Sequence, residues 1–276
     1  MRRTITSRDN SVLRLARSVR DGKVDELIFV EGLRLCEEAV RSQLAINAVI
    51  YSNEIAEKPR AAAFLQEVEP LLPHVDAVSE KLLASICYTR TPQGIVLLAT
   101  HPPSGPDALD HTINAKPMLV VLHRVSNPVN VGAILRSAEA AGATGVIATT
   151  NTADPFSPKA LRGAMGSAFR LPIWYGPSFE ETISWCRARG IRSVSADLEA
   201  QTTYTVVDWN MSTALFIGCE ASGLSVDEAT ATDFAVRIPM HGSVESLNVA
   251  VATGILLYEA ARQRGINEQL SGDEDR

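Results

Sequence analysis

The chain has 276 residues, of which 46% are hydrophobic and 21% are charged, so it is too apolar for a disordered protein and long enough for one large domain or two modest ones. Its four cysteines lie far apart without a Cys-x-x-Cys pair, so we expect neither a disulfide framework nor a metal site. Because no apolar run resembles a signal peptide or spans a bilayer, we expect a cytoplasmic protein without membrane contact.

The net charge of −6 argues mildly against nucleic acid as a partner. Basic residues nevertheless crowd the stretch from Arg2 to Lys23. Such a cluster can bind phosphate under a negative total charge, because cellular salt screens fields beyond about 8–10 Å. A solvated helix face is the alternative explanation of the same residues. The candidate RNA-binding residues of this arm are Arg8, Arg14 and Arg17.

The first hundred residues alternate between short apolar strands and helical patterns. Strands are expected at LIFVEG, INAVIYS and GIVLLAT, and helices around residues 34–41, 60–69 and 79–86. This alternation predicts a small α/β domain over residues 1–100. Residues 101–116, rich in Pro, Gly and Asp, are predicted to be a linker.

A larger α/β domain is predicted over residues 117–265, followed by a frayed tail over residues 266–276. Helices are expected around residues 133–142, 180–189 and 248–264. The strands read as continuously apolar runs separated by these helices, which indicates a parallel sheet covered on both faces. The expected strands are MLVVLHRV, TGVIATT, SVSAD, TALFIG and AVRIPM.

Three loops follow strands of this domain, at the edge where parallel sheets bind ligands. In the first, SNPVNVGAILR, Asn130 is expected just before a helix and Arg136 about one turn into it, where they could hold a phosphate and a ribose hydroxyl. A plain joint would instead use Asn130 as the helix N-cap and leave Arg136 on a solvated face.

The second loop, IGCEASGLS, offers Gly218, whose missing side chain permits close backbone approach, and Glu220, a lone carboxylate. The third, IPMHGSVESLN, follows a strand expected to end at Met240. Ser246 or Asn248 there is a plausible N-cap of the next helix. Each loop has a plain structural explanation when it is taken singly.

Together, the three loops resemble the three motifs of the TrmH (SpoU) family of the SPOUT methyltransferases. They match in order N-P-x-N-x-G-A-I-x-R, I-G-x-E-x-x-G-L-S and I-P-M-x-G-x-x-x-S-L-N. Between the first two, SPKALRGAMGSAFRLP matches the family pattern with Arg162 in its basic position. The pieces TSRDN, FVEGLRLCEEA and TPQGIV are similar to the L30e-like substrate-binding domain that many members carry.

The resemblance implies an S-adenosylmethionine-dependent enzyme that methylates a ribose 2′-hydroxyl of structured RNA, with ribosomal 23S RNA favoured. It also implies a deep trefoil knot at the C-terminal end of the second domain and a homodimer. Carried over by position, the catalytic residues are Arg136, Asn130, Glu220, Ser246 and Asn248. The cofactor-binding residues are Gly218, Ile238, Met240 and Leu247. Arg162 is an RNA-binding residue beside those of the basic arm.

Chemistry restricts the roles within this set. A guanidinium does not deprotonate in a protein, so Arg136 is expected to grip phosphate and stabilise a developing alkoxide. Glu220 is the better proton acceptor, provided that burial raises its pKa. The sequence departs from the family at Asn127, where Asp is common, and in the small-residue-rich GAMGSAF, so substrate fit could differ.

Two other interpretations of the sequence stay open, and a third lacks support. The chain could be a transfer-RNA 2′-O-methyltransferase, or a non-catalytic RNA-binding protein of the same fold. A nucleotide-binding oxidoreductase requires a glycine-rich fingerprint that the sequence lacks.

Overall fold

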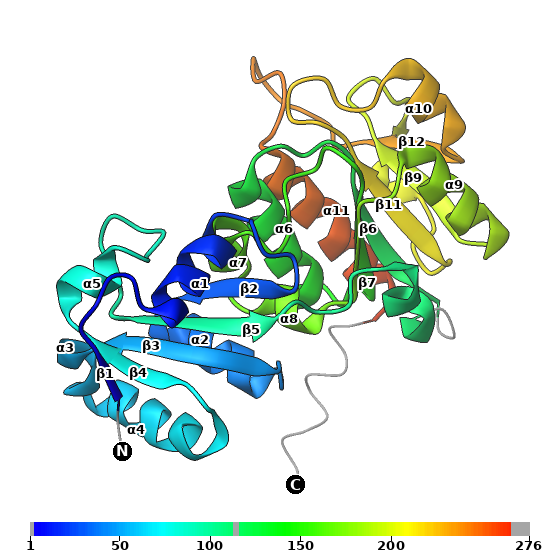
Figure 1. Cartoon of the computed structure of the whole chain (residues 1–276). Coiled ribbons are helices and arrows are strands. Elements are labelled where there is room, and N and C mark those ends of the chain that lie inside the picture. The colour runs from blue at the N-terminus through cyan, green and yellow to red at the C-terminus, as the bar shows by residue number, and fades with distance from the viewer. Residues whose placement is uncertain (1–2, 113–115, 266–276) are drawn as a thin grey trace, which may run out of the picture. The chain divides into compact units, whose positions relative to one another are not determined.

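The computed structural model describes residues 3–112 and 116–265, and the chain forms two compact units (Figure 1). The first comprises Met1–Pro102 together with Phe156–Arg170, and the second comprises the remainder. Residues 156–170 fall within the second domain of the sequence-based division, but they pack in the first unit. The reason is that their helix, residues 158–164, packs against the strand at residues 27–31 of the first unit and buries Leu161.

The first unit is a mixed α/β structure. Its strands are β1 (Arg3–Ile5), β2 (Leu27–Glu31), β3 (Ile46–Ser52), β4 (Val75–Val78) and β5 (Ile95–Thr100). Its helices are α1 (Ser11–Arg20), α2 (Leu33–Arg41), α3 (Asn53–Ala56), α4 (Pro59–Val68), η1 (Glu69–Leu71), α5 (Glu80–Ala84), α7 (Pro158–Ala164) and α8 (Ser167–Arg170).

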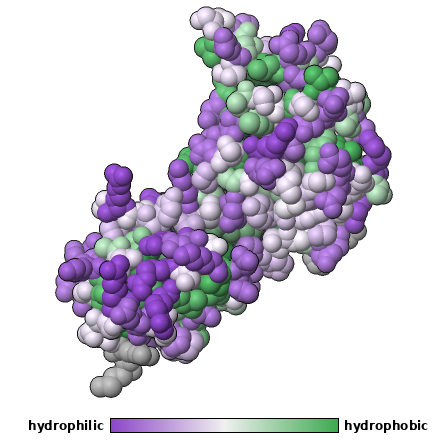
Figure 2. Space-filling view, turned by 45° about the horizontal axis from the view of Figure 1, so that its top comes forward, coloured by the Kyte–Doolittle hydropathy of each residue, from purple (hydrophilic) through white to green (hydrophobic). Residues whose placement is uncertain are grey.

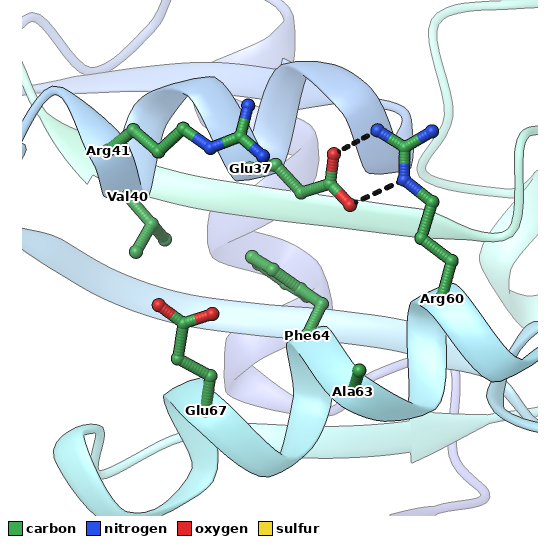
Figure 3. Close-up of a pocket in the computed structure, with 7 residues that line it drawn as sticks. All are labelled: Glu37, Val40, Arg41, Arg60, Ala63, Phe64 and Glu67. Atoms are coloured by element: carbon green, nitrogen blue, oxygen red, sulfur yellow. Dashed lines mark hydrogen bonds and ion pairs between the residues drawn. The ribbon is translucent and has the colours of Figure 1, made fainter. Parts of the chain in front are cut away.

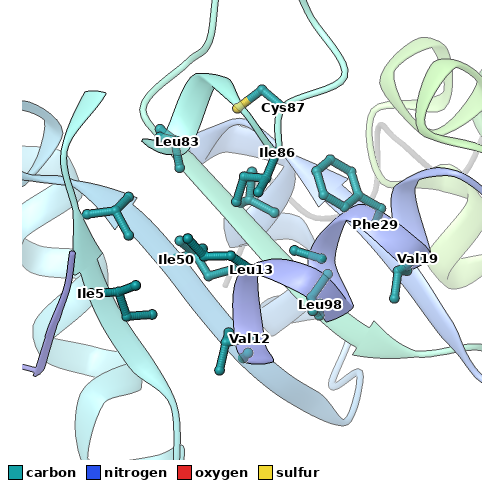
Figure 4. Packing of buried hydrophobic residues seen from close by; sticks show 14 residues of the cluster. Ile5, Val12, Leu13, Val19, Phe29, Ile50, Leu83, Ile86, Cys87 and Leu98 are labelled. Atoms are coloured by element: carbon teal, nitrogen blue, oxygen red, sulfur yellow. The ribbon is translucent and has the colours of Figure 1, made fainter. Parts of the chain in front are cut away.

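The five strands form one sheet in the order β1-β4-β3-β5-β2, in which β5 runs antiparallel to both of its neighbours. One face of this sheet is covered by α1 and α5 (Figure 4). Leu13 of α1, Ile50 of β3 and Leu98 of β5 meet there and are fully buried. The basic arm is therefore partly an amphipathic helix: α1 buries Val12, Leu13, Ala16 and Val19 on one side, and Arg14 is exposed on the other.

The second unit carries the three loops singled out by the sequence. Its strands are β6 (Met118–Leu122), β7 (Gly145–Ala148), β8 (Ile173–Tyr175), β9 (Arg192–Ala196), β10 (Thr202–Thr203), β11 (Thr213–Ile217) and β12 (Phe234–Arg237). Its helices are η2 (Pro106–Thr112), α6 (Pro128–Ala140), α9 (Phe179–Ala188), η3 (Tyr204–Val206), α10 (Val226–Ala231) and α11 (Val249–Gln263).

All seven strands are parallel, in the order β10-β12-β9-β11-β6-β7-β8, which confirms the predicted parallel sheet. The central strands β6 and β11 are buried at every position, as a sheet covered on both faces requires. Figure 1 shows α9 on one side of the sheet and the packed pair α6 and α11 on the other. The carboxyl ends of β11 and β6 consequently meet at one edge.

Some boundaries differ from the expected ones. The strand expected to end at Met240 ends at Arg237, so Ile238 and Met240 belong to the following loop. All four cysteines are free, and no described helix is long and apolar enough to cross a membrane. On the face shown in Figure 2, hydrophilic and hydrophobic residues are interspersed.

Candidate active site

The first motif forms the start of α6, which begins earlier than the sequence indicated. Asn127 is the N-cap, its side chain accepting from the Val129 N–H at 3.0 Å, and Pro128 occupies the first helical turn. Asn130 therefore lies inside the helix rather than before it, which corrects its predicted place as N-cap. Arg136 accordingly lies about two turns along α6 instead of one. Asn127 caps the helix as Asp would, so this departure from the family leaves the local structure intact.

Glu220 joins the second motif to the first. Its carboxylate accepts hydrogen bonds from the backbone N–H groups of Ser126, at 3.2 Å, and Asn127, at 3.1 Å. It also accepts from Nδ2 of Asn130 at 3.0 Å. Because β11 and β6 are neighbours in the sheet, the loops that follow them are brought together, and this one carboxylate fastens them.

Asn248 adds the third motif to the same network. Its Nδ2 donates to Oδ1 of Asn130 at 3.2 Å, while its own Oδ1 caps α11 by accepting from the Ala250 N–H at 2.9 Å. Asn130 is buried and bonded on both sides, so its amide orientation is set by Glu220 and Asn248. Three sequence-predicted catalytic residues thus form one hydrogen-bonded chain.

The electrostatics of Glu220 oppose its expected role as proton acceptor. Burial acts to raise the pKa of Glu220, but the hydrogen bonds from Asn130 and from backbone N–H groups outweigh it and hold the pKa below its ordinary value. The expected net rise in the pKa of Glu220 is therefore not seen, because the hydrogen bonds outweigh burial. A carboxylate held in its ionised form is a weak base, so Glu220 is better suited to orienting Asn130 than to removing a proton.

Gly218 sits where the second motif folds back on itself. A Cβ at this position would lie 2.3 Å from the carbonyl carbon of Gly223 and 2.5 Å from the backbone nitrogen of Leu224. The Gly223 N–H donates to the Cys219 carbonyl at 2.9 Å and closes the turn. The absence of a side chain at Gly218 is thus required first by the protein's own backbone, before any ligand is considered.

The third motif contains the 239–247 loop, which is not held by hydrogen bonds as the second motif is. Within the described ranges, no hydrogen bond joins residues 239–247 to another protein group. Ser246 is exposed and, unlike Asn248, does not join the network. Free main-chain donors and acceptors beside the half-buried Ile238, Met240 and Leu247 suit a cofactor with a polar amino acid portion and an apolar thioether region. The donor set therefore fits S-adenosylmethionine.

The arginines assigned to chemistry and RNA are exposed, apart from the half-buried Arg17. Arg136 is exposed, and no hydrogen bond or ion pair is found for its guanidinium among the described residues. Arg8, Arg14 and Arg162 are exposed in the first unit, and Nη2 of Arg17 donates to the Arg8 carbonyl at 2.8 Å. The four candidate RNA-binding residues therefore share one unit.

Sequence reasoning missed a second carboxylate of this region. Glu228 in α10 accepts from Nε2 of His123 at 3.0 Å and from Nη2 of Arg124 at 2.5 Å. The pattern Ser225-x-x-Glu228 was a readable capping box, and the structure contains one. The pairing with residues after β6 was not readable, because it depends on strand order.

The pocket of the first unit contains no candidate site residue. A pocket of about 340 Å³ lies between α2 and α4 of the first unit (Figure 3). The Glu37 and Arg60 side chains that line it neutralise each other in an ion pair. In the described part of the chain, no group of three or more His, Cys, Asp or Glu side chains could hold a metal.

Comparison with known proteins identifies both parts of the chain. The SpoU rRNA Methylase family matches residues 117–258, and the MRM3-like substrate binding domain matches residues 14–97. An uncharacterized tRNA/rRNA methyltransferase of Synechocystis sp. is 31% identical over 95% of this chain and 94% of that protein.

Two further similarities come from Streptomyces viridochromogenes. A 23S rRNA (uridine(2479)-2′-O)-methyltransferase is 41% identical over 150 residues, covering 52% of each protein. The crystal structure of the SpoU methyltransferase AviRb in complex with AdoMet has a TM-score of 0.82 and 30% identity, over 92% of this chain and 98% of that one. With three motifs joined at one sheet edge and a family match over half of its length, this chain belongs to the SpoU rRNA methylase family.

Proposed function

We propose that the chain is an S-adenosylmethionine-dependent methyltransferase that modifies a ribose 2′-hydroxyl of structured RNA, with 23S ribosomal RNA as its substrate. The observation that carries the proposal is the chain of hydrogen bonds from Glu220 through Asn130 to Asn248, which brings the three motifs together. The AdoMet-bound relative, similar over nearly the whole chain, and the relative named for 2′-O-methylation of 23S rRNA support the cofactor and substrate.

When bound, S-adenosylmethionine would supply a sulfonium methyl group for transfer to the ribose 2′-oxygen, and the hydroxyl proton would pass to solvent water. A neutral hydroxyl is a poor nucleophile, so the protein must orient it and stabilise the developing negative charge. Arg136 carries a permanent charge and is free of protein partners among the described residues, so it can grip the adjacent phosphate and stabilise the alkoxide. Asn130, fixed on both sides, orients the ribose.

Main-chain groups hold the cofactor in this scheme. The 239–247 loop provides unpaired N–H and C=O groups, and Gly218 lies at the end of the adjacent part of the sheet. Ile238, Met240 and Leu247 contribute apolar contacts, while Ser246 contacts the substrate. The RNA is gripped through phosphate contacts by the exposed Arg8, Arg14 and Arg162 and by the half-buried Arg17, all in the first unit.

We further infer that the enzyme is a homodimer. A groove of about 670 Å³ runs between α6 and α11, and it is lined mainly by small and apolar side chains. Val251 and Tyr258 are 52% and 55% exposed there. Because the groove reaches Asn130 and Asn248, a second copy seated on it would complete the site. Val251→Glu should convert the protein to a monomer in light scattering, and an unchanged dimer mass would disprove this interface.

Family membership supports two further parts of the proposal. One is the deep trefoil knot at the C-terminal end of the second unit. The other is a cytoplasmic location.

The decisive experiment maps 2′-O-methylated nucleotides in ribosomal and transfer RNA from cells with and without the gene. One site in 23S RNA should lose its methyl group without the gene and regain it when purified protein and S-adenosylmethionine are added. Loss at a transfer-RNA site would redirect the substrate assignment. No lost site, and no transfer to total RNA, would leave a non-catalytic RNA-binding protein. Thermal stabilisation by NAD but not by S-adenosylhomocysteine would favour the oxidoreductase reading.

A further inference from the structure

A second set of contacts holds the loop that carries Glu220. This loop, residues 218–225, runs from β11 to α10, and Glu220 fastens its first half. Its last residue, Ser225, is the N-cap of α10 and forms a capping box with Glu228. The Ser225 N–H donates to Oε2 of Glu228 at 2.8 Å. In a simple capping box the carboxylate would have no further partner in the protein.

Here the same carboxylate also binds the segment after β6. His123 donates from Nε2 to Oε1 of Glu228, and Arg124 donates from Nη2 to Oε2. The side chain of Glu228 is only 18% exposed, so these bonds replace most of its solvation. Burial acts to raise the pKa of Glu228, but its hydrogen bonds outweigh burial and lower the pKa, so the carboxylate stays ionised.

His123 is itself held by groups at the carboxyl ends of β11 and β7. It is 5% exposed, its backbone N–H donates to the Ile217 carbonyl at 2.8 Å, and its Nδ1 lies 2.9 Å from Oγ1 of Thr149. Thr149 is fully buried and directly follows β7. Since the ionised Glu228 can only accept, the proton of a neutral ring is assigned to Nε2, and Nδ1 accepts from the Thr149 hydroxyl.

The surroundings of His123 favour that neutral form. Burial lowers the pKa of His123 most, and Arg124 lowers it further, while Glu228 and Glu180 act in the opposite direction and do not prevail. The edge of the Phe179 ring packs against the imidazole with centroids 5.0 Å apart. The neutral ring is therefore held as a donor to Glu228.

Backbone geometry points the same way. Arg124 has φ = 56°, a left-handed conformation that residues with side chains rarely adopt unless their surroundings impose it. This conformation turns the chain between His123 and the Ser126–Asn127 pair that binds Glu220. The segment after β6 thus bonds first to Glu228, which caps the last residue of the 218–225 loop, and then to Glu220 near the start of the loop. Both ends of the loop are therefore tied to this one segment.

We infer that His123 is a positioning residue: with Arg124 it holds Glu228, and through Glu228 and Ser225 it fixes the 218–225 loop, so that Gly218 and Glu220 face the cofactor and Asn130. The inference rests on the proposed function for its consequence in catalysis. His123 touches neither the cofactor nor the RNA in this scheme. It acts by keeping the loop in register with the segment after β6.

The test compares His123→Phe, which keeps a ring but loses both hydrogen bonds, with His123→Gln, which can still donate to Glu228 and accept from Thr149. The matched control is Ile183→Ala, which opens a cavity in the apolar cluster that contains Phe179. All three are assayed at a temperature where calorimetry shows them folded. His123→Phe should raise the KM for S-adenosylmethionine and lower kcat/KM about tenfold or more. His123→Gln should remain within about threefold, and Ile183→Ala should lose thermal stability only.

A readout independent of catalysis uses Cys219, which lies inside the loop and is the one cysteine of the chain that is not buried. Without cofactor, His123→Phe should speed the reaction of Cys219 with a thiol reagent severalfold, while His123→Gln and Ile183→Ala should not. If wild-type protein shows no methyl transfer but this labelling pattern holds, the proposed function fails and the positioning role stands. If His123→Phe lowers stability with unchanged labelling and unchanged KM, His123 is merely a core residue and the inference is overturned.

Discussion

Two loops of the second unit carry candidate cofactor contacts, and they are held in opposite ways. The 218–225 loop is fixed through Glu220 and Glu228, and its chain folds so tightly that Gly218 has no room for a side chain. The 239–247 loop has no hydrogen bond to the rest of the described protein. The difference indicates a site of which one side is formed in advance, while the other keeps its main-chain groups free for a ligand.

The largest effect is expected outside both loops, at Arg136. Arg136→Ala should reduce methyl transfer at least a hundredfold, because no other described side chain of the site offers a permanent positive charge to the phosphate and alkoxide. Stability and cofactor affinity should stay unchanged, since the side chain is exposed and free of partners among the described residues. A loss of tenfold or less, about 1.4 kcal/mol of transition-state stabilisation, would contradict the catalytic role of Arg136 and assign the main stabilising groups to the two loops.

The next effect tests how rigid the 218–225 loop is. Gly218→Ala places a carbon within 2.6 Å of three backbone atoms, so the loop must shift, and calorimetry should show S-adenosylmethionine binding weakened at least tenfold. Gly105→Ala is the matched control, because nothing lies within 4 Å of its added carbon. Equal affinities for the two variants would show that the loop yields easily and does not position the cofactor.

A smaller effect contrasts the loops directly by hydrogen exchange. Without ligand, amides of the 239–247 loop should exchange much faster than those of Asn127 and Gly223, which are hydrogen-bonded. Saturating S-adenosylhomocysteine should slow the 239–247 loop severalfold and change the 218–225 loop little. Equal protection of both loops by ligand would contradict a site that is half formed in advance.

The smallest effect concerns Cys219 in the wild-type protein. The backbone N–H groups of Ala221 and Ser222 lower the pKa of its thiol, whereas burial raises the pKa values of Cys87 and Cys186 to about 12. Because the thiolate is the reactive form, one thiol per chain should react rapidly near neutral pH, with a pH–rate midpoint below that of a free thiol. Cys219→Ser should remove this fast phase, and a second fast thiol would show that the cores are looser than the structure indicates.

The sequence by itself predicted what depends on short-range pattern. Continuous apolar runs separated by helices gave the parallel sheet, and three motifs in order gave the family, the site loops and Asn130, Glu220 and Asn248. Each of these signals lies within about ten residues, because strand burial, turn glycines and capping residues act over that distance.

Only the tertiary structure decided which distant groups meet. Strand order places β11 beside β6, and that placement gives Glu220 its hydrogen-bond donors and lowers its pKa, which disfavours it as the proton acceptor. The same adjacency pairs His123 with Glu228, 105 residues apart. Only the tertiary structure showed that Leu161 and its helix belong to the first unit and not to the second. The charge state and position of a side chain depend on neighbours that strand order supplies, and a local pattern does not contain strand order.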